Sequence, residues 1–233
     1  DATGHVTVGT YEINGSPAHF FNGTIDNVQI WQRALTASQV AALAGLSYVD
    51  SVWQWGPSGG TPTGTVNQVA DTGGAYAQYP GEIGARVTAP RPAFFRTDKS
   101  FTVEAWVRDD ALTGGTATAV TFADGDKMPV SLDYHPEWGS RWSFMLTDSR
   151  ILVSDASPVE GKWTHLAGTY DASANRACFY VNGQLQNTEL TSSGATTIQG
   201  CSAGVVSKNN NGSVVAGAGY WNGGQLVNPW RGG

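Results

Sequence analysis

Residues 101–108 read FTVEAWVR and alternate along their whole length. The two series are Phe101, Val103, Ala105 and Val107 on one side, and Thr102, Glu104, Trp106 and Arg108 on the other. Successive side chains of a strand point to opposite faces, so this period of two predicts a β-strand. Apolar groups occur on both faces, which indicates a central strand of a two-layer sandwich. Glu104 is expected to be a solvent-facing residue of that strand.

Other local signals also favour an all-β chain. Asn182-Gly183 separates two apolar runs, and both residues tolerate the positive φ of a type I′ hairpin turn. Residues 24–31 alternate as a half-buried strand, and further short strands are expected at 48–55, 117–123, 130–134, 141–146 and 151–154. One helix is predicted after Thr36, because Thr36 and Gln39 form a capping box.

The two ends of the chain repeat each other. Residues 4–23 read GHVTVGTYEINGSPAHFFNG, and residues 212–232 read GSVVAGAGYWNGGQLVNPWRG. Gly4 corresponds to Gly212 and Val6 to Val214 at one offset of 208 positions (212 − 4). The chain therefore contains one repeat period and a short overlap, as in a tandem array.

Composition and charge argue against a nucleic-acid partner and against a membrane span. The chain has 233 residues, 30 glycines, only 14% charged residues and a net charge of −6. The 13 basic residues are scattered, whereas nucleic-acid-binding proteins gather Lys and Arg on one face, so no nucleic-acid partner is expected. No run of 18 apolar residues is present, so no membrane span is expected either.

The two cysteines, Cys178 and Cys201, are an even count in an acidic chain rich in glycine, threonine and tryptophan. A disulfide in a secreted, extracellular protein is the preferred interpretation. Two buried free thiols are the alternative, and spacing alone does not decide between them.

Four motifs together resemble one family. SFTVEAWVR (100–108), GKWTHLAGTYD (161–171), FYVNGQL (179–185) and FNGTIDNVQIWQRALTASQVAAL (21–43) are similar to laminin G-like modules of the concanavalin A-like superfamily. The tandem modules of secreted actinobacterial proteins are the most similar. The resemblance implies an all-β, two-sheet antiparallel jelly-roll sandwich with one short helix, and it covers nearly the whole chain.

The chain differs from that family in the order of its segments along the sequence. The G-x-I-D-x-V strand and its helix, which end a normal module, come first here. Residues 1–45 would then be the terminal strands and helix of one repeat, and 46–233 the body of the next without its last strand. Unpaired backbone at such a vacancy is costly. Strand 24–31 is expected to fill it, within its own chain as a permuted sandwich or in a neighbour by self-association.

The repeated strand poses a second question. Residues 6–11 duplicate residues 214–219, so two copies compete for one position. We expect one copy to lie at a sheet edge, to pair with another molecule, or to be loose.

The sequence favours a protein that is not an enzyme. Glycoside hydrolysis needs two carboxylates across a sugar cleft, and none of the six glutamates shows the E-x-D-x-x-E spacing of the related hydrolases. G-x-S-x-G is absent, and the four histidines have no metal-ligand spacing. His165 is expected to have a core or hydrogen-bonding role.

Calcium is a possible cofactor implied by the resemblance. Many such modules hold Ca²⁺ between a glycine-rich turn and the terminal strand through hard oxygen ligands. The matching positions are Asp71 in ADTGG and Asp26 in GTIDNV. Asp71 could equally cap a turn before Thr-Gly-Gly.

Aromatic residues in loops suggest a glycan-binding surface, because a sugar ring stacks on an aromatic face while nearby polar groups bond its hydroxyls. The candidate ligand-binding residues are Tyr134, Glu137, Trp138, Tyr220, Trp221 and Asn222. Loop aromatics also commonly fold back on the sandwich. The sequence thus favours an extracellular recognition or adhesion module for a glycan or a protein surface. The alternative is an architectural spacer of a tandem assembly.

Overall fold

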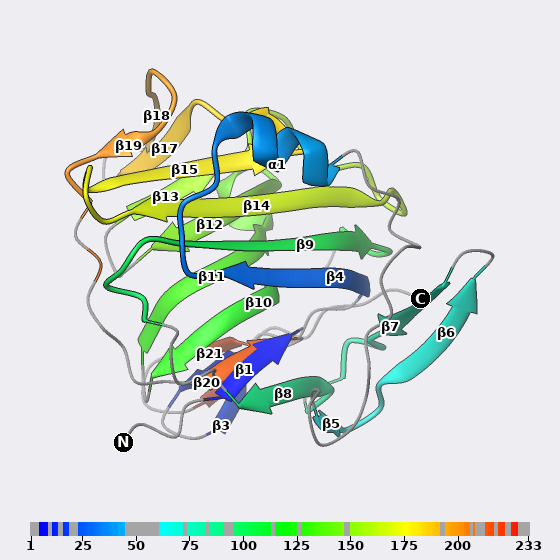
Figure 1. The fold of residues 1–233 in the computed structure, drawn as a ribbon. Helices are drawn as coiled ribbons and strands as arrows, with labels where there is room; N and C mark the ends of the chain where they lie inside the picture. The colour runs from blue at the N-terminus through cyan, green and yellow to red at the C-terminus, as the bar shows by residue number, and fades with distance from the viewer. Residues whose placement is uncertain are drawn as a thin grey trace.

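The computed structural model describes residues 5–8, 11–13, 16–18, 23–44, 61–71, 74–82, 84–90, 96–112, 115–124, 127–146, 150–191, 194–205, 207, 213–216, 219–221 and 225–227. In this part of the chain two large sheets pack face to face (Figure 1). The ten-stranded sheet has the order β18 (Gly194–Thr197), β17 (Thr188–Thr191), β13 (Arg150–Val153), β12 (Arg141–Leu146), β11 (Lys127–His135), β10 (Ala117–Asp124), β20 (Ser213–Ala216), β1 (His5–Val8), β8 (Arg86–Pro90) and β5 (Thr61–Thr63).

The eight-stranded sheet has the order β16 (Gln184–Leu185), β15 (Arg176–Val181), β14 (Thr164–Asp171), β9 (Phe101–Asp109), β4 (Gly23–Trp31), β7 (Gly74–Gln78) and β6 (Asn67–Asp71), and β19 (Ser202–Ala203) pairs with β15. Two small hairpins, β2 (Tyr11–Ile13) with β3 (Ser16–Ala18) and β21 (Gly219–Trp221) with β22 (Gln225–Val227), complete the strands. The helices among the described residues are α1 (Ala37–Ala44) and the 3-10 helix η2 (Pro136–Trp138). The two-sheet sandwich with one α-helix is the predicted fold.

The core lies between the two sheets. The inward side chains of β9, including Phe101, Val103 and Val107, are almost completely buried against residues of β10, β11 and β12. Gly168 in β14 faces the ring of Phe144 in β12, and a Cβ at this glycine would overlap that ring. The strict alternation at 101–108 therefore does mark a central strand, because β9 lies between β14 and β4.

The strand predicted at 24–31 pairs within its own chain. β4 is antiparallel to β9, with Ile25 opposite Val107 and Ile30 opposite Val103. On its other side, Ile25 lies opposite Ala77 in β7. Figure 1 shows β4 beside β9 although they are far apart in the sequence. Its partners are buried core residues, so the hydrophobic effect holds this early segment in the middle of the sheet.

The expectation that one copy of the repeated strand lies at a sheet edge was wrong. Both copies, β1 and β20, lie inside the ten-stranded sheet between β10 and β8. They pair with each other in parallel, with Thr7 opposite Val215 and Val8 opposite Ala216. Neither copy is at an edge, because β1 gains a second neighbour in β8.

The predicted capping box and hairpin turn are both present. The Thr36 N–H donates to Gln39 Oε1 at 3.0 Å, and the Gln39 N–H donates to Thr36 Oγ1 at 3.3 Å. Val40 of α1 is fully buried in a cluster with Ala167 and Tyr180 of the eight-stranded sheet, so the helix covers part of its outer face. Asn182 and Gly183 have φ values of 49° and 74°, as a type I′ turn requires.

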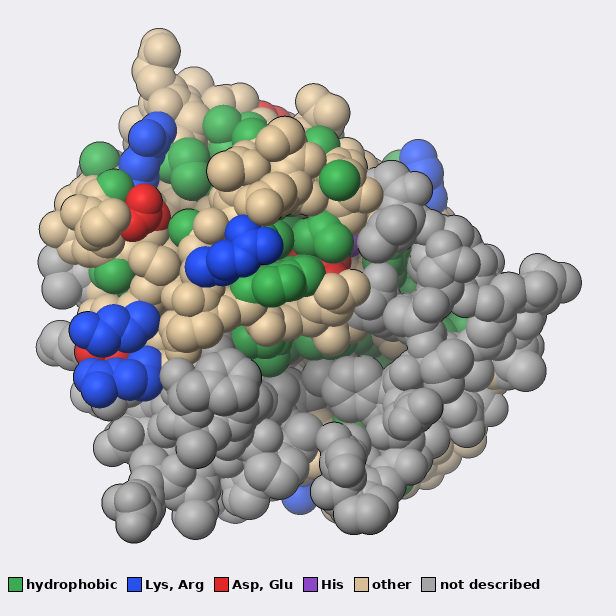
Figure 2. Space-filling model, viewed as in Figure 1, with side chains coloured by type: hydrophobic (Ala, Val, Ile, Leu, Met, Phe, Trp, Pro, Cys, Tyr) green, Lys and Arg blue, Asp and Glu red, His purple; other side chains and the backbone are tan. Residues whose placement is uncertain are grey.

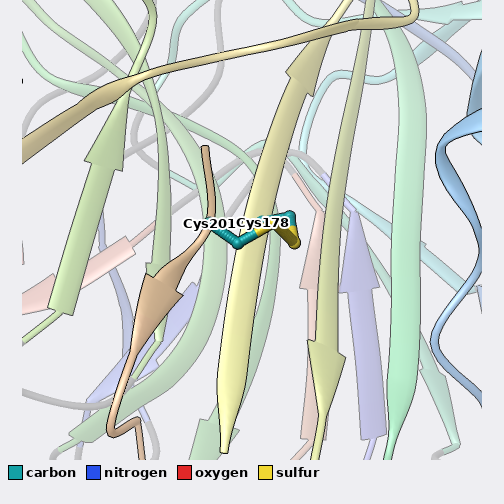
Figure 3. The surroundings of a disulfide bond; sticks show 2 residues. All are labelled: Cys178 and Cys201. Atoms are coloured by element: carbon teal, nitrogen blue, oxygen red, sulfur yellow. A yellow bond between two sulfur atoms is a disulfide. The ribbon is translucent and has the colours of Figure 1, made fainter. Parts of the chain in front are cut away.

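The predicted disulfide joins Cys178 and Cys201, whose Cα atoms are 4.4 Å apart (Figure 3). Cys178 lies in β15, and Cys201 immediately precedes β19. β19 contributes only two residues to the sheet, with Ala203 opposite Arg176. The bond therefore attaches a very short edge strand covalently to its neighbour.

Glu104 is not solvent-facing, contrary to prediction. Its side chain is on the outer face of β9 but the residue is only 1% exposed. One carboxylate oxygen is hydrogen-bonded to Nε2 of His165, which is itself fully buried and packs against the Trp106 ring at 5.4 Å. Burial raises the pKa of Glu104, and the His165 hydrogen bond opposes that rise. The hydrogen-bonding role predicted for His165 is confirmed.

Charged groups are sparse on the side of the molecule that carries α1. Figure 2 shows Lys, Arg, Asp and Glu side chains scattered over this side without a continuous patch of one sign in its described part. The described residues include no helix long and apolar enough to cross a membrane. The strand predicted at 48–55 lies outside the described residues.

Candidate functional site: the polar face of the ten-stranded sheet

β11 separates an apolar face from a polar one by simple alternation. Val130, Leu132 and Tyr134 belong to the core between the sheets. Ser131, Asp133 and His135 therefore point to the opposite side of the ten-stranded sheet. They are only 1%, 1% and 6% exposed, so this outer face is covered as well.

Asp133 is held by hydroxyl groups. Thr118 Oγ1 in β10 donates to Asp133 Oδ1 at 2.7 Å, and the Ser131 hydroxyl donates to the other carboxylate oxygen. Ser143 lies directly opposite Asp133 in β12 and is fully buried. Its Oγ has no hydrogen-bond partner in the structure. A buried hydroxyl without a partner carries a desolvation cost of about 1–3 kcal/mol, which water or a ligand group can remove.

His135 connects this buried network to the surface. Its Nδ1 is 2.7 Å from Glu137 Oε1, and its Nε2 is 3.9 Å from Asp133 Oδ2. Burial acts against the charged imidazole, but Asp133 and Glu137 outweigh it and raise the His135 pKa. His135 Nε2 has no hydrogen-bond partner, so this ring nitrogen is unused by the protein when the ring is protonated.

Glu137 is the exposed member of the network. Its side chain is 49% exposed, and the Thr116 hydroxyl lies 2.9 Å from both carboxylate oxygens. Partial burial opposes ionisation, but the hydrogen bond and charge of His135 prevail and hold the Glu137 pKa at about 2. Glu137 is therefore an anion with acceptor capacity left over, since a carboxylate offers about four lone-pair sites.

Trp138 lies beside this carboxylate. The 3-10 helix η2 starts at Pro136, whose fixed φ suits a helix start, and ends at Gly139 with φ 81°. This short turn stacks the Trp138 ring on the His135 ring, with centroids 3.5 Å apart and planes 14° apart. The indole is half-buried. Its orientation is fixed from one face by a residue that also anchors Glu137.

The small hairpins lie against the strands that carry the polar face. β2 and β21 both lie against β10 and β11. The predicted ligand residues Tyr220 and Trp221 belong to β21, so the backbone that carries them packs on the same two strands. Their side chains, and Asn222 altogether, lie outside the described residues.

The structure separates the predicted ligand residues of the 134–138 segment. Tyr134 is 1% exposed in the core, packs edge-on against Trp142, and donates from its hydroxyl to the Leu112 carbonyl at 2.8 Å. It therefore belongs to the core face of β11, opposite to His135. Sequence reasoning passed over Asp133 and His135, although Ser-Leu-Asp-Tyr-His at 131–135 alternates and could have shown which residues share the outer face.

A hollow lies at the same end of the sandwich as η2, because Ser157 in its lining donates to the Gly139 carbonyl. A cleft of about 410 Å³ is bounded by the segment 154–162 and the Asn182 turn, with Trp142 and Leu185 among its apolar lining. The Gln186 side chain accepts from the Asp155 N–H at 2.8 Å and donates to a backbone carbonyl. Its buried amide is thus used by the protein itself.

The predicted calcium ligands cannot be assessed in the same way. Asp26 is in β4 and Asp71 in β6, but their side chains lie outside the described residues. Among the side chains that are described, no group of three or more His, Cys, Asp or Glu is arranged to hold a metal ion. The Ca²⁺ site stays a prediction.

Comparison with known proteins identifies the superfamily of this sandwich. The family model of the concanavalin A-like lectin/glucanases superfamily matches residues 80–228. The chain belongs to this superfamily. The superfamily match includes β8 to β22 and hence the whole polar face from Thr116 to Ser143, whereas β4 and α1 precede it.

Other comparisons add little to the superfamily assignment. No curated protein matches the sequence. A solved structure of a proposed carbohydrate-binding protein from Bacteroides ovatus ATCC 8483 is 12% identical, over 84% of this chain and 64% of that one, with a TM-score of 0.22. The chain thus spans less than two thirds of that protein. We base no argument on a superposition this loose.

Proposed function

We propose that the chain is a non-catalytic, extracellular carbohydrate-recognition module that binds its ligand at Trp138 and Glu137. The observation that carries this proposal is the stack of Trp138 on His135 beside an ionised, half-exposed Glu137. Sugars offer an apolar ring face for stacking and hydroxyl groups for a carboxylate acceptor. Both protein groups are held in place beforehand by His135 and Thr116, which lowers the entropic cost of binding.

A binding role accounts for the chemistry better than hydrolysis does. Glycoside hydrolysis requires a second carboxyl group free to act as acid, base or nucleophile. Asp133 is the other carboxylate of the described network, but it is 1% exposed and both of its oxygens already accept hydroxyl hydrogen bonds. The disulfide supports an extracellular location, because such bonds persist in oxidising compartments.

The test is a glycan array followed by calorimetry on any ligand found. Trp138→Ala should weaken binding at least tenfold, and Glu137→Gln should weaken it less, because the amide keeps one acceptor. Trp163→Ala is the matched control, since this half-buried tryptophan packs against Tyr76 in the eight-stranded sheet. A ligand whose affinity is unchanged by Trp138→Ala would refute the site. An array without any signal would favour the architectural spacer.

A further inference from the structure

The cleft bounded by the segment 154–162 and the Asn182 turn has the size of a ligand site. Its volume is about 410 Å³, and small-molecule sites typically measure about 300–1,000 Å³. The segment 154–162 leads from β13 in the ten-stranded sheet to β14 in the eight-stranded sheet, and the turn between β15 and β16 forms the facing wall. The cleft therefore lies where the chain passes from one sheet to the other.

Hydrogen bonds fix the walls of this cleft. Asp155 Oδ1 accepts from the Asn187 N–H at 2.9 Å and from the Thr188 hydroxyl at 2.7 Å. The Gln186 side chain accepts from the Asp155 N–H at 2.8 Å, so the segment 154–162 is attached to the residues that follow β16. A site whose walls are held in place beforehand loses less conformational entropy on binding.

The lining includes an apolar wall. Val159 is 61% exposed, and no other large apolar side chain in the described part of the chain is classed as exposed. Val181 and Leu185 on the facing wall are half-buried. Such a wall suits the apolar face of a sugar ring, because stacking there removes apolar surface from water.

Lys162 brings a positive charge to the cleft. Within the described ranges no carboxylate forms an ion pair with its ammonium group. Asp155 is the one carboxylate of the lining, and its oxygens accept from the backbone and the side chain of Asn187. Glu160 is not in the lining and accepts the Leu112 N–H at 3.0 Å. The positive charge of Lys162 is therefore left for a ligand.

The Asn182 turn supplies further polar groups. Asn182 Oδ1 accepts the His165 N–H at 2.9 Å, which leaves the NH₂ of this side chain without an acceptor in the described structure. Gln184 is exposed, and its side-chain amide has no partner among the same residues. A cation and an amide donor on facing walls favour an anionic acceptor, since hydrogen bonds to charged groups are the stronger ones.

The cleft adjoins the turn that carries Trp138. The Ser157 hydroxyl in its lining donates to the Gly139 carbonyl at 3.4 Å. Gly139 directly follows Trp138 and caps η2. A ligand of several sugar units can therefore contact Trp138 with one unit and enter the cleft with another.

We propose that the cleft is a second subsite, selective for a sugar that carries a carboxylate, a uronic acid. The carboxylate accepts from Lys162 and Asn182, and the sugar ring lies against Val159. This inference rests on the proposed function, because it makes one ligand span Trp138 and the cleft. The ligand class is then an acidic oligosaccharide.

NMR titration of the full chain, labelled with nitrogen-15, tests this with sodium glucuronate and with glucuronamide, its uncharged amide. We expect glucuronate to shift the backbone amide signals of Lys162, Asn182 and Gln184. It should bind about three to five times more tightly than glucuronamide, because exposed ion pairs contribute modestly. Lys162→Gln should remove this preference. Lys99→Gln removes an exposed positive charge outside the cleft and should keep it.

Three results would overturn the inference: glucuronate that binds no better than glucuronamide, cleft signals that do not move, or a preference that survives Lys162→Gln. A glycan ligand weakened by Trp138→Ala but not by Lys162→Gln would also overturn it, and would leave the proposed function in place. If instead the proposed function fails, array ligands are indifferent to Trp138→Ala while glucuronate still shifts the cleft signals of that variant. The cleft would then be an acidic-sugar site of its own.

Discussion

Asp109 provides the sharpest test of the electrostatics of this fold. The residue ends β9 and is 1% exposed. Its Oδ1 accepts the Ala111 N–H at 2.8 Å, whereas its Oδ2 has no hydrogen-bond partner. Burial, with smaller contributions from the negative charges of Asp110 and Glu160, raises the Asp109 pKa to about 9. Asp109 is therefore protonated in the folded protein at neutral pH and ionised in the unfolded chain.

The sign of the pH dependence follows from this difference. Between the unfolded value of 3.8 and about 9, the folded state holds one more proton than the unfolded state. The free energy of unfolding must then fall by about 1.4 kcal/mol per pH unit on account of this group. From pH 5 to pH 8 the loss is roughly 4 kcal/mol.

Asp109→Asn removes the titration and keeps the acceptor for Ala111. We expect the stability difference, variant minus wild type, to rise by about 1.4 kcal/mol per pH unit between pH 5 and 8. The amide NH₂ left without an acceptor adds a constant cost of about 1–3 kcal/mol, which does not change the slope. Urea unfolding followed by tryptophan fluorescence at half-unit pH steps measures both the slope with pH and the constant cost.

Asp171→Asn is the control for that series. A hydrogen bond from Ser173 lowers the Asp171 pKa below its ordinary value, so this group titrates below the pH 5–8 window. The difference in free energy of unfolding between Asp171→Asn and wild type should not change between pH 5 and 8. Parallel pH profiles for wild type and Asp109→Asn would refute the reasoning, since they would show that Asp109 is ionised in the folded protein.

Three further predictions concern packing, the disulfide and the ion. Gly168→Ala should lower stability by at least about 1–3 kcal/mol in urea unfolding, because the new methyl group overlaps the Phe144 ring; an unchanged midpoint would contradict this close approach. Cys178→Ala/Cys201→Ala should cost about 3 kcal/mol, as expected for a bond that closes a separation of 23 residues, and equal stability of reduced and oxidised wild type would argue against it. EDTA should lower the melting temperature if the predicted Ca²⁺ site is filled, and calcium should restore it; no shift would count against the ion.

Local patterns predicted local structure well. The alternation at 101–108, the capping box of Thr36 with Gln39 and the Asn182-Gly183 turn each depend on a few neighbouring residues, and all three are confirmed. The failures arose where burial depends on distant segments. Glu104 is buried because His165 of the next strand bonds it and α1 covers the adjoining outer face, which alternation within β9 cannot reveal.

At the candidate site, too, the local pattern identified some residues, and only contacts with distant segments identified the others. The motif around Glu137 and Trp138 was visible as a loop with aromatic and acidic residues. Tyr134 was grouped with them, but it is a strand residue whose parity points it into the core. His135 and Asp133 became visible as their support only when strand pairing set Ser143 and Thr118 beside them.

The sequence by itself determined the resemblance to the family, the all-β class and the repeat offset, because these follow from residue order and short-range pattern; it favoured a disulfide between Cys178 and Cys201 without deciding it. Only the tertiary structure decided that β4 closes the sheet of its own chain, that both repeated strands share one sheet, and that the polar face is covered. These outcomes depend on which backbone edges meet in three dimensions, and the residue order within each strand does not encode those pairings.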